Sequence, residues 1–374
     1  MGDMSSTART TDAAALALEY GDRLVLGTVR EVHGAVARRA FGATRLLGSR
    51  FPESVHDAVA GSVYGGLSGA LRLSGAAARS LASRGIGTPI DDTRIGRQVR
   101  AAVNGLVGDE LRLQDDPHAI TMSLRRDGVD LPATAWHLRH AHPDATGHLV
   151  VFVHGLCENE ESWLVGARDR PTYVERLAAE TDATPVLLRY NTGLHVAENG
   201  QHLDELLEQV VAAWPVAVHR LTLVGYSMGG LVIRAATNRA TVSGHQWAHR
   251  VGEVVCLGTP HAGANLEKAA RLGSRLLRIR PRATPFGANL DAGSAGIVDL
   301  RHGYITADEW EGRDLTARWG LDRIAAAPLA HAEYHFVAAA NDVALLDHPR
   351  VADWLVTWVN ARPRHTRRLA PGRP

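Results

Sequence analysis

The sequence predicts an α/β fold in which helices flank a mostly parallel central sheet. Three observations lead to this prediction. Short apolar runs alternate with helical patterns from about residue 96 onward, as in βαβ units. The run Leu149–Val153 is apolar throughout, which a strand covered on both faces requires. A glycine-rich turn at residues 225–229 joins one such run directly to a helical pattern.

The expected elements follow from apolar periodicity. The expected strands are Ile120–Leu124, Ala135–Leu138, Leu149–Val153, Pro185–Tyr190, Leu221–Gly225, Val254–Gly258 and Tyr334–Ala340, of which the first two form an antiparallel lead-in. The expected helices are Tyr173–Glu180, Leu203–Trp214, Met228–Asn238, Leu266–Leu277 and Val351–Asn360.

The chain divides into three parts by composition. Residues 1–95 are predicted to be a helical extension that ends in a Gly/Pro linker, and residues 96–362 form the α/β domain. Residues 363–374 are basic and proline-rich, which is typical of a disordered tail. Apolar spacing in residues 13–85 is compatible with a helical hairpin or lid on the domain, or with a surface pair that contacts lipid.

Composition limits the partners and the location. The 374 residues carry 41 Lys and Arg against 40 Asp and Glu. The resulting net charge of +1 provides no strong positive potential that would attract nucleic acid. We expect a cytoplasmic protein, membrane-peripheral if residues 13–85 touch lipid, because neither a secretory signal nor a membrane span is visible. Cys157 and Cys256 are expected to be buried free thiols. No metal spacing is present, no organic cofactor is implied, and the oligomeric state is not indicated.

The turn at Gly225, Tyr226, Ser227, Met228 and Gly229 has the pattern G-x-S-x-G between an apolar strand and a helix. This arrangement is a nucleophile elbow, in which a tight turn holds the serine in a strained conformation at the helix N-terminus. The dipole of the helix and its unbonded N–H groups stabilise a developing oxyanion. Ser227 is therefore the predicted nucleophile.

A second strand end completes the predicted site. The strand Leu149–Val153 is followed by His154 and Gly155, and the loop at this position supplies a second oxyanion donor. The predicted donors are the backbone amides of Leu156 and Met228. We expect His154 and Gly155, together with His261 after the next strand, to brace the site rather than to react.

With these segments in view, the chain resembles actinobacterial α/β-hydrolases related to triacylglycerol lipases and GPI inositol-deacylase-like serine esterases. The matching segments are V-F-V-H-G-L-C-E-N-E-E-S-W (151–163), R-Y-N-T-G-L-H (189–195), G-Y-S-M-G-G-L-V (225–232), L-G-T-P-H-A-G-A (257–264) and G-I-V-D-L-R-H-G-Y (296–304). The resemblance implies an α/β-hydrolase fold and ester hydrolysis. Tyr226 replaces the histidine usual between glycine and serine, and its side chain is expected to pack behind the elbow.

One departure from the resemblance concerns the rest of the catalytic triad. The resemblance implies a long segment carrying the acid and then a histidine before the last helix, but here Ala340 is followed at once by N-D-V-A-L-L-D-H-P, which shortens the C-terminal part of the sheet. Three hypotheses stay open. Asp342 is the acid and His348 the base, although Asp347 and Pro349 around it also read as a helix cap. Another histidine is recruited, with His261, His331 and His335 available. Or the triad is incomplete.

The predicted function is hydrolysis of a small-molecule or lipid ester through an acyl-Ser227 intermediate. The alternatives are a binding or scaffold protein that keeps the fold without turnover, and a thioesterase or peptidase.

Overall fold

The computed structural model describes residues 89–164, 170–261, 294–309, 328–337 and 345–361, together with the isolated residues 15, 76, 77, 80 and 84. The predicted extension therefore lies almost entirely outside the described residues. The same holds for the predicted helix Leu266–Leu277 and for the C-terminal tail.

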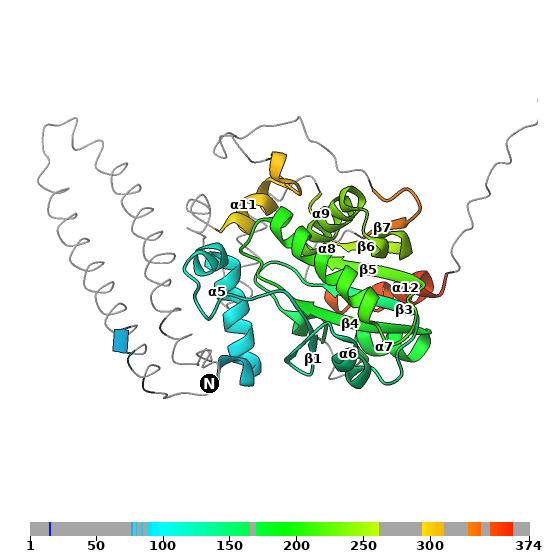
Figure 1. Cartoon of the computed structure of the whole chain (residues 1–374), viewed down its shortest axis with the longest axis horizontal. Coiled ribbons are helices and arrows are strands. Elements are labelled where there is room, and N and C mark those ends of the chain that lie inside the picture. The colour runs from blue at the N-terminus through cyan, green and yellow to red at the C-terminus, as the bar shows by residue number, and fades with distance from the viewer. Residues whose placement is uncertain are drawn as a thin grey trace, which may run out of the picture.

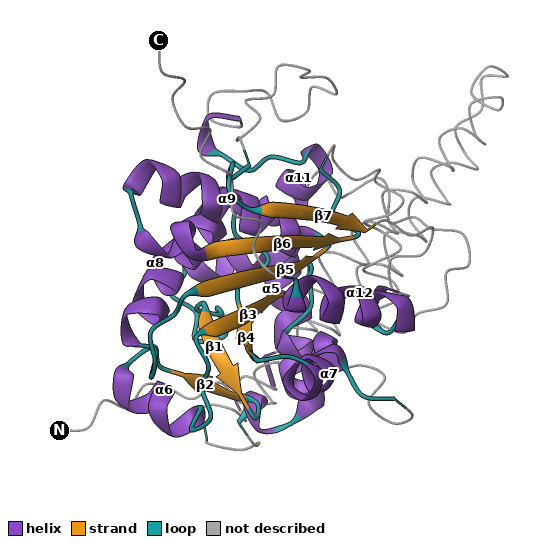
Figure 2. Ribbon diagram, turned by 90° about the vertical axis from the view of Figure 1, so that its right-hand side faces the viewer, coloured by secondary structure: helices purple, strands orange, loops and turns teal. Residues whose placement is uncertain are grey.

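A single mixed sheet of seven strands forms the centre of the described fold, in the order β2-β1-β4-β3-β5-β6-β7. Strands β3 to β7 are parallel, while β1 is antiparallel to both β2 and β4. The carboxyl ends of β3, β5 and β6 lie side by side at one edge of the sheet (Figure 2). The strands are β1 (Ser123–Arg126), β2 (Val129–Leu131), β3 (His148–Val153), β4 (Ala183–Arg189), β5 (Arg220–Tyr226), β6 (Val251–Leu257) and β7 (Glu333–Val337).

Helices cover both faces of this sheet (Figure 1). One face packs against α8 and α9 through alternating residues such as Val151, Leu223 and Cys256. The opposite residues, such as Phe152 and Val224, pack against α7 and α12. The helices are α5 (Arg94–Leu113), α6 (Ala135–Ala141), α7 (Tyr173–Glu180), α8 (Val196–Ala213), α9 (Met228–Ser243), α11 (Ala295–His302) and α12 (Pro349–Asn360), with 3₁₀ turns η2 (Ile90–Asp92), η3 (Glu160–Leu164), η4 (Gln246–Arg250) and η6 (Ala307–Glu309).

The predicted strand Ala135–Leu138 is wrong, because these residues begin helix α6. Thr134 caps this helix, with its side chain accepting a hydrogen bond from the amide of His137. The second lead-in strand is instead β2, which pairs with β1 through a tight hairpin. Asp127 and Gly128 both have positive φ, 51° and 78°, as the favoured two-residue hairpin turn requires.

The other expected strands and helices that lie among the described residues agree with the predictions apart from their ends. Helix α7 has the predicted bounds, and a capping box between Thr172 and Glu175 fixes its start. Helix α8 begins seven residues earlier than predicted. Helices α5 and α11 were not among the expected elements. Cys157 and Cys256 are free and buried, as predicted.

The strand order, with an antiparallel start and parallel strands joined by helices on both faces, is that of an α/β-hydrolase fold. In the part of the chain that the structure describes, β7 is the edge strand beyond β6, and Phe336 on it is 63% exposed. Within the same ranges, no helix combines the length and apolar character needed to cross a bilayer.

Candidate active site at the carboxyl edge of the sheet

Ser227 lies at the abrupt junction between β5 and α9. Strand β5 ends at Tyr226 and helix α9 begins at Met228, so one residue makes the whole turn. Its backbone has φ 50° and ψ −118°, a conformation that residues other than glycine rarely adopt. The turn is held because the Ser227 amide donates to the carbonyl of Leu257 on β6 at 2.8 Å. The predicted strained elbow is thus present in the backbone geometry.

Two glycines of the motif are required by close approach of neighbouring backbone. A Cβ on Gly229 would lie 2.2 Å from the carbonyl oxygen of Val153, and one on Gly225 would lie 2.6 Å from the amide of Gly230. Any side chain at these positions would push α9 away from β3 and β5. The glycines therefore let the helix start directly above the strand ends.

The loop after β3 lies against the elbow. A Cβ on Gly155 would be 3.3 Å from Ser227 Cβ and 3.1 Å from the ring of Tyr226. Ser227 itself is 8% exposed, so its side chain lies in a largely enclosed position rather than on the surface. Tyr226 is fully buried behind the elbow, as expected.

The two predicted oxyanion donors belong to the two segments that meet at Ser227, helix α9 and the loop after β3. Met228 is the first residue of α9, and the first N–H groups of a helix have no acceptor within that helix. Leu156 follows Gly155 in the loop that contacts Ser227, and both Leu156 and Met228 have buried side chains. The turn after Leu156 is tight, since Cys157 has φ 60° and its amide donates to Thr192 Oγ1 at 3.1 Å.

His154 is buried and both of its ring nitrogens are engaged. Its Nε2 accepts the amide of Tyr190 at 3.3 Å, and Nδ1 lies 3.0 Å from the carbonyl oxygen of Gly155. The ring stacks on that of Tyr190 at 4.4 Å, and burial lowers the pKa of His154 to about 3. These contacts support the predicted bracing role, because they leave a neutral imidazole that ties β3 to the end of β4.

His261 contacts helix α9 and strand β7. Its Nδ1 lies 3.1 Å from Arg234 Nη1, and its ring meets Phe336 edge-on at 5.0 Å. Burial and the charge of Arg234 lower the pKa of His261 to about 4. The Arg234 contact makes this histidine a poor candidate for accepting a proton and is compatible with bracing.

Of the predicted acid and base, Asp342 lies outside the described residues and His348 is placed. His348 is exposed and is the N-cap of α12, where its Nδ1 accepts the amide of Arg350 at 3.2 Å. The cap is therefore His348 and not Asp347, which instead pairs with Arg170. Pro349 lies in the first turn as expected. For His348 to act as a base oriented by an acid through Nδ1, this cap bond must break, and the pair with Asp342 stays a prediction.

The two other candidate histidines are bonded away from the elbow. His331 precedes β7, at the amino edge of the sheet, and its Nε2 lies 3.0 Å from the carbonyl oxygen of Ala248. His335 lies within β7, where its Nε2 contacts Glu253 Oε2 at 2.7 Å and its ring stacks on Trp358 of α12. Neither imidazole is therefore presented at the carboxyl edge.

A carboxyl group that the sequence analysis did not single out lies beside the elbow. Glu158 Oε2 accepts the amide of Gly155 at 3.1 Å and would be 3.2 Å from a Cβ on that glycine. Burial raises the pKa of Glu158 to about 7, against the opposing effect of the Gly155 bond. In the sequence, Glu158 belongs to an acidic run whose other glutamates, Glu160 and Glu161, are also buried but pair with arginines.

An unpredicted pair of side chains also lies near this edge, between the start of α8 and α11. His195 Nδ1 lies 3.0 Å from Asp299 Oδ2, which also accepts the amide of Val196 at 2.7 Å. Burial is the largest single effect and opposes protonation of His195. The bond to Asp299 and the charges of Asp299, Glu198 and Asp109 together outweigh it and raise the pKa of the imidazole. Both residues belong to segments quoted for the resemblance, which was the available signal.

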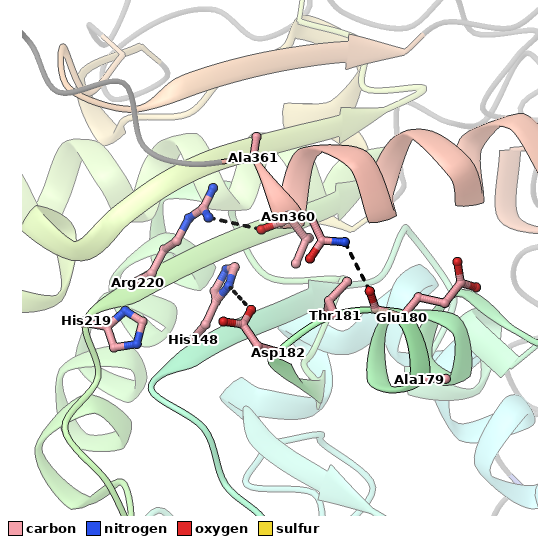
Figure 3. Close-up of a pocket in the computed structure, with 10 residues that line it drawn as sticks. His148, Ala179, Glu180, Thr181, Asp182, His219, Arg220, Asn360 and Ala361 are labelled. Carbon is pink, nitrogen blue, oxygen red and sulfur yellow. Dashed lines mark hydrogen bonds and ion pairs between the residues drawn. The ribbon is translucent and has the colours of Figure 1, made fainter.

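A cavity of about 580 Å³ lies at the opposite, amino edge of the sheet (Figure 3). Arg220 on its wall donates to the carbonyl of Val359 at 3.1 Å and to Glu253 at 3.0 Å. His148, also on the wall, lies 3.0 Å from Thr222 Oγ1. These polar groups connect the end of α12 with the first residues of β3 and β5, at the end of the sheet opposite the elbow.

Among the described residues, no three His, Cys, Asp or Glu side chains are grouped as a metal site requires. A family model described as a domain of unknown function (DUF7379) matches residues 127–288. No curated protein matches the chain significantly.

Several solved structures are similar at low identity. A lipase-esterase related protein from Clostridium acetobutylicum is 12% identical, with 57% of this chain and 95% of that chain covered and a TM-score of 0.34. The NocB thioesterase domain, solved as a covalent complex with a fluorophosphonate nocardicin G analogue, is 16% identical over 58% of this chain and 95% of that chain, with a TM-score of 0.33. A proline iminopeptidase from Mycobacterium smegmatis is 13% identical over 57% and 92%, with a TM-score of 0.27. The fold assignment rests on the strand order and the helix layers described above.

Proposed function

We propose that this protein is a serine hydrolase that cleaves carboxylic esters through an acyl-Ser227 intermediate. One observation carries the proposal: Ser227 alone makes the turn from β5 to α9, at φ 50°, with its Cβ against the loop at Gly155. A protein maintains backbone strain of this kind where the surrounding structure enforces it, and such strain clusters at active sites.

The proposed chemistry uses the two amides that flank the serine. Ser227 Oγ attacks the ester carbon, and the amides of Leu156 and Met228 donate to the oxygen that becomes negative. A pair of fixed backbone donors of this kind stabilises the transition state more than the ground state, because the charge develops only during the reaction. The preference for esters rests on the resemblance of the sequence to lipase-like hydrolases.

The serine also needs a base, since its hydroxyl is a weak nucleophile at neutral pH. The predicted base, His348, would have to release the amide of Arg350 and turn toward the elbow. A second candidate function therefore has a specific observation in its favour. If no base reaches Ser227, the fold serves as a binding or scaffold protein.

A fluorophosphonate probe tests the proposal. We expect the wild-type protein to be labelled and Ser227→Ala to remain unlabelled, while both keep the same unfolding midpoint. Absence of labelling in both would overturn the proposed activity and favour the binding function. A panel of p-nitrophenyl esters, acyl-CoA thioesters and peptides then separates esterase from thioesterase and peptidase activity, with the esters expected to be cleaved fastest.

The predicted extension can be tested on the same activity. If residues 13–85 act as a lid or a lipid contact, deleting residues 1–85 changes hydrolysis of emulsified esters more than hydrolysis of soluble ones. Equal effects on both substrates would count against that role.

A further inference from the structure

Glu158 and Ser227 both lie close to Gly155. A Cβ on this glycine would be 3.2 Å from Glu158 Oε2 and 3.3 Å from Ser227 Cβ, so both residues border the space that such a Cβ would occupy. The Gly155 amide holds one carboxylate oxygen in place at 3.1 Å. Glu158 is thus fixed against the same loop that carries the proposed oxyanion donor Leu156.

Among the described residues, Glu158 bonds only neutral groups, the amide of Gly155 and the side chain of Ser162, and forms no ion pair. Its charge acts on the Cys157 thiol and the Tyr190 phenol, and burial, the larger effect, raises the pKa of Cys157 to about 12 and that of Tyr190 well above 10. His154, at the start of the same loop, has a pKa lowered to about 3 by burial. All three are therefore neutral near pH 7.

The neighbouring carboxylates of the same acidic run differ from Glu158 because each has a guanidinium partner. Arg125 Nε donates to Glu160 Oε1 at 2.8 Å, and Arg97 Nε donates to Glu161 Oε1 at 2.7 Å. Arg94 also contacts Glu161, at 3.2 Å. These ion pairs fix η3 to α5 and β1, whereas Glu158 faces the elbow.

We propose that Glu158 is the general base that takes the proton of Ser227, in place of the triad histidine. The inference rests on the proposed serine hydrolase function. A carboxylate buried next to a nucleophile, with a pKa shifted toward neutral, has the basicity that proton abstraction at neutral pH requires.

The proton and charge balance is complete without another group. The Ser227 Oγ–H proton moves to a Glu158 oxygen as Oγ bonds to the ester carbon, and the carbonyl oxygen becomes the oxyanion. When the intermediate collapses, the C–O bond to the leaving group breaks and the alkoxide takes the proton from Glu158. Water then attacks the acyl-Ser227 carbon, giving its proton to Glu158, and the Ser227 oxygen regains that proton as the acid leaves.

The experiment compares Glu158→Gln with the wild type. Glutamine keeps an oxygen that can accept the Gly155 amide, so a purely structural role survives the change while the base is lost. We measure the second-order rate of fluorophosphonate labelling of Ser227 from about pH 5 to about pH 9. The wild-type rate is expected to rise with pH through a midpoint near 7, and Glu158→Gln to lower the plateau by about 10²-fold or more and remove that midpoint.

The matched control is Glu161→Gln, a neighbouring buried glutamate in an ion pair. It is expected to lower the unfolding midpoint but to keep the wild-type pH dependence. If Glu158→Gln does not fold, the wild-type profile still decides: the midpoint of a carboxyl group shifts little with temperature, whereas that of an imidazole falls as temperature rises.

Three outcomes would overturn the assignment of Glu158: an unchanged rate and pH profile in Glu158→Gln, a wild-type midpoint that falls with temperature, or loss of the midpoint in His348→Gln. Each of these requires a labelled wild-type protein. Failure of the proposed function itself is a different result, namely no labelling of wild-type Ser227 at any pH.

Discussion

Replacing the strained serine by glycine is expected to stabilise the protein, although it removes the proposed nucleophile. Ser227 has φ 50° and ψ −118°, a conformation that glycine adopts without a Cβ clash. Residues held in such regions cost about 1–3 kcal/mol. Glycine gives back about 0.5–1 kcal/mol through the greater freedom of the unfolded chain. The net gain expected for Ser227→Gly is about 1 kcal/mol.

Ser227→Ala is the informative comparison, because alanine removes the hydroxyl and keeps the strain. The expected order of stability is therefore glycine above alanine at position 227, by about 1 kcal/mol, measured as a shift of the urea midpoint without a change in slope. Ser243, the exposed last residue of α9, provides the control. There the order should reverse, since glycine is about 0.5–1 kcal/mol less favourable than alanine in a helix. If alanine at position 227 were as stable as glycine, the elbow would not be strained.

Three further predictions concern the packing and charge around the site. Gly229→Ala places a Cβ 2.2 Å from the Val153 carbonyl oxygen and should lower the free energy of unfolding by more than about 3 kcal/mol in the same urea assay. Gly244→Ala has nothing within 4 Å but a φ of 69°, so it should lower that free energy by only about 1–2 kcal/mol. Arg220→Ala leaves buried Glu253 without its guanidinium partner and should lower the free energy of unfolding by about 3–5 kcal/mol. Arg176→Ala breaks exposed ion pairs and should lower it by less than about 1 kcal/mol. Equal losses for the two variants would refute this distinction. Because the pKa of His195 is raised above 6.5 in the folded state, its contribution to stability is fully present below that pH and is lost as pH rises through the folded pKa. His195→Gln should remove that pH dependence, and an unchanged stability profile would contradict it.

The parts of the fold that the sequence predicted are those in which local pattern and burial agree. β3 and β5 are fully buried and mostly apolar, so their strands could be placed to within one or two residues. The elbow was predictable because its chemistry depends on three residues within one five-residue segment. The wrong strand at Ala135–Leu138 is short, and there the cap from Thr134 decides in favour of a helix.

The base could not be predicted in the same way, because it depends on contacts between distant segments. Glu158 stands in an acidic run with Glu160 and Glu161, and the sequence gives no sign that arginines pair with the latter two and leave Glu158 beside the elbow. Similarly, His195 and Asp299 are more than a hundred residues apart and meet only because α11 packs on the loop after β4. The sequence also could not show that His348 is the N-cap of α12, because the cap is formed by its side chain accepting the amide of Arg350.

The most direct test of the account is to trap the covalent intermediate. The protein is mixed with a p-nitrophenyl ester, quenched with acid at the time of the initial burst, digested and analysed by mass spectrometry. We expect the acyl mass on the peptide that carries Ser227 and nowhere else. Ester turnover with an unmodified Ser227 peptide, or with the acyl group on another residue, would contradict it.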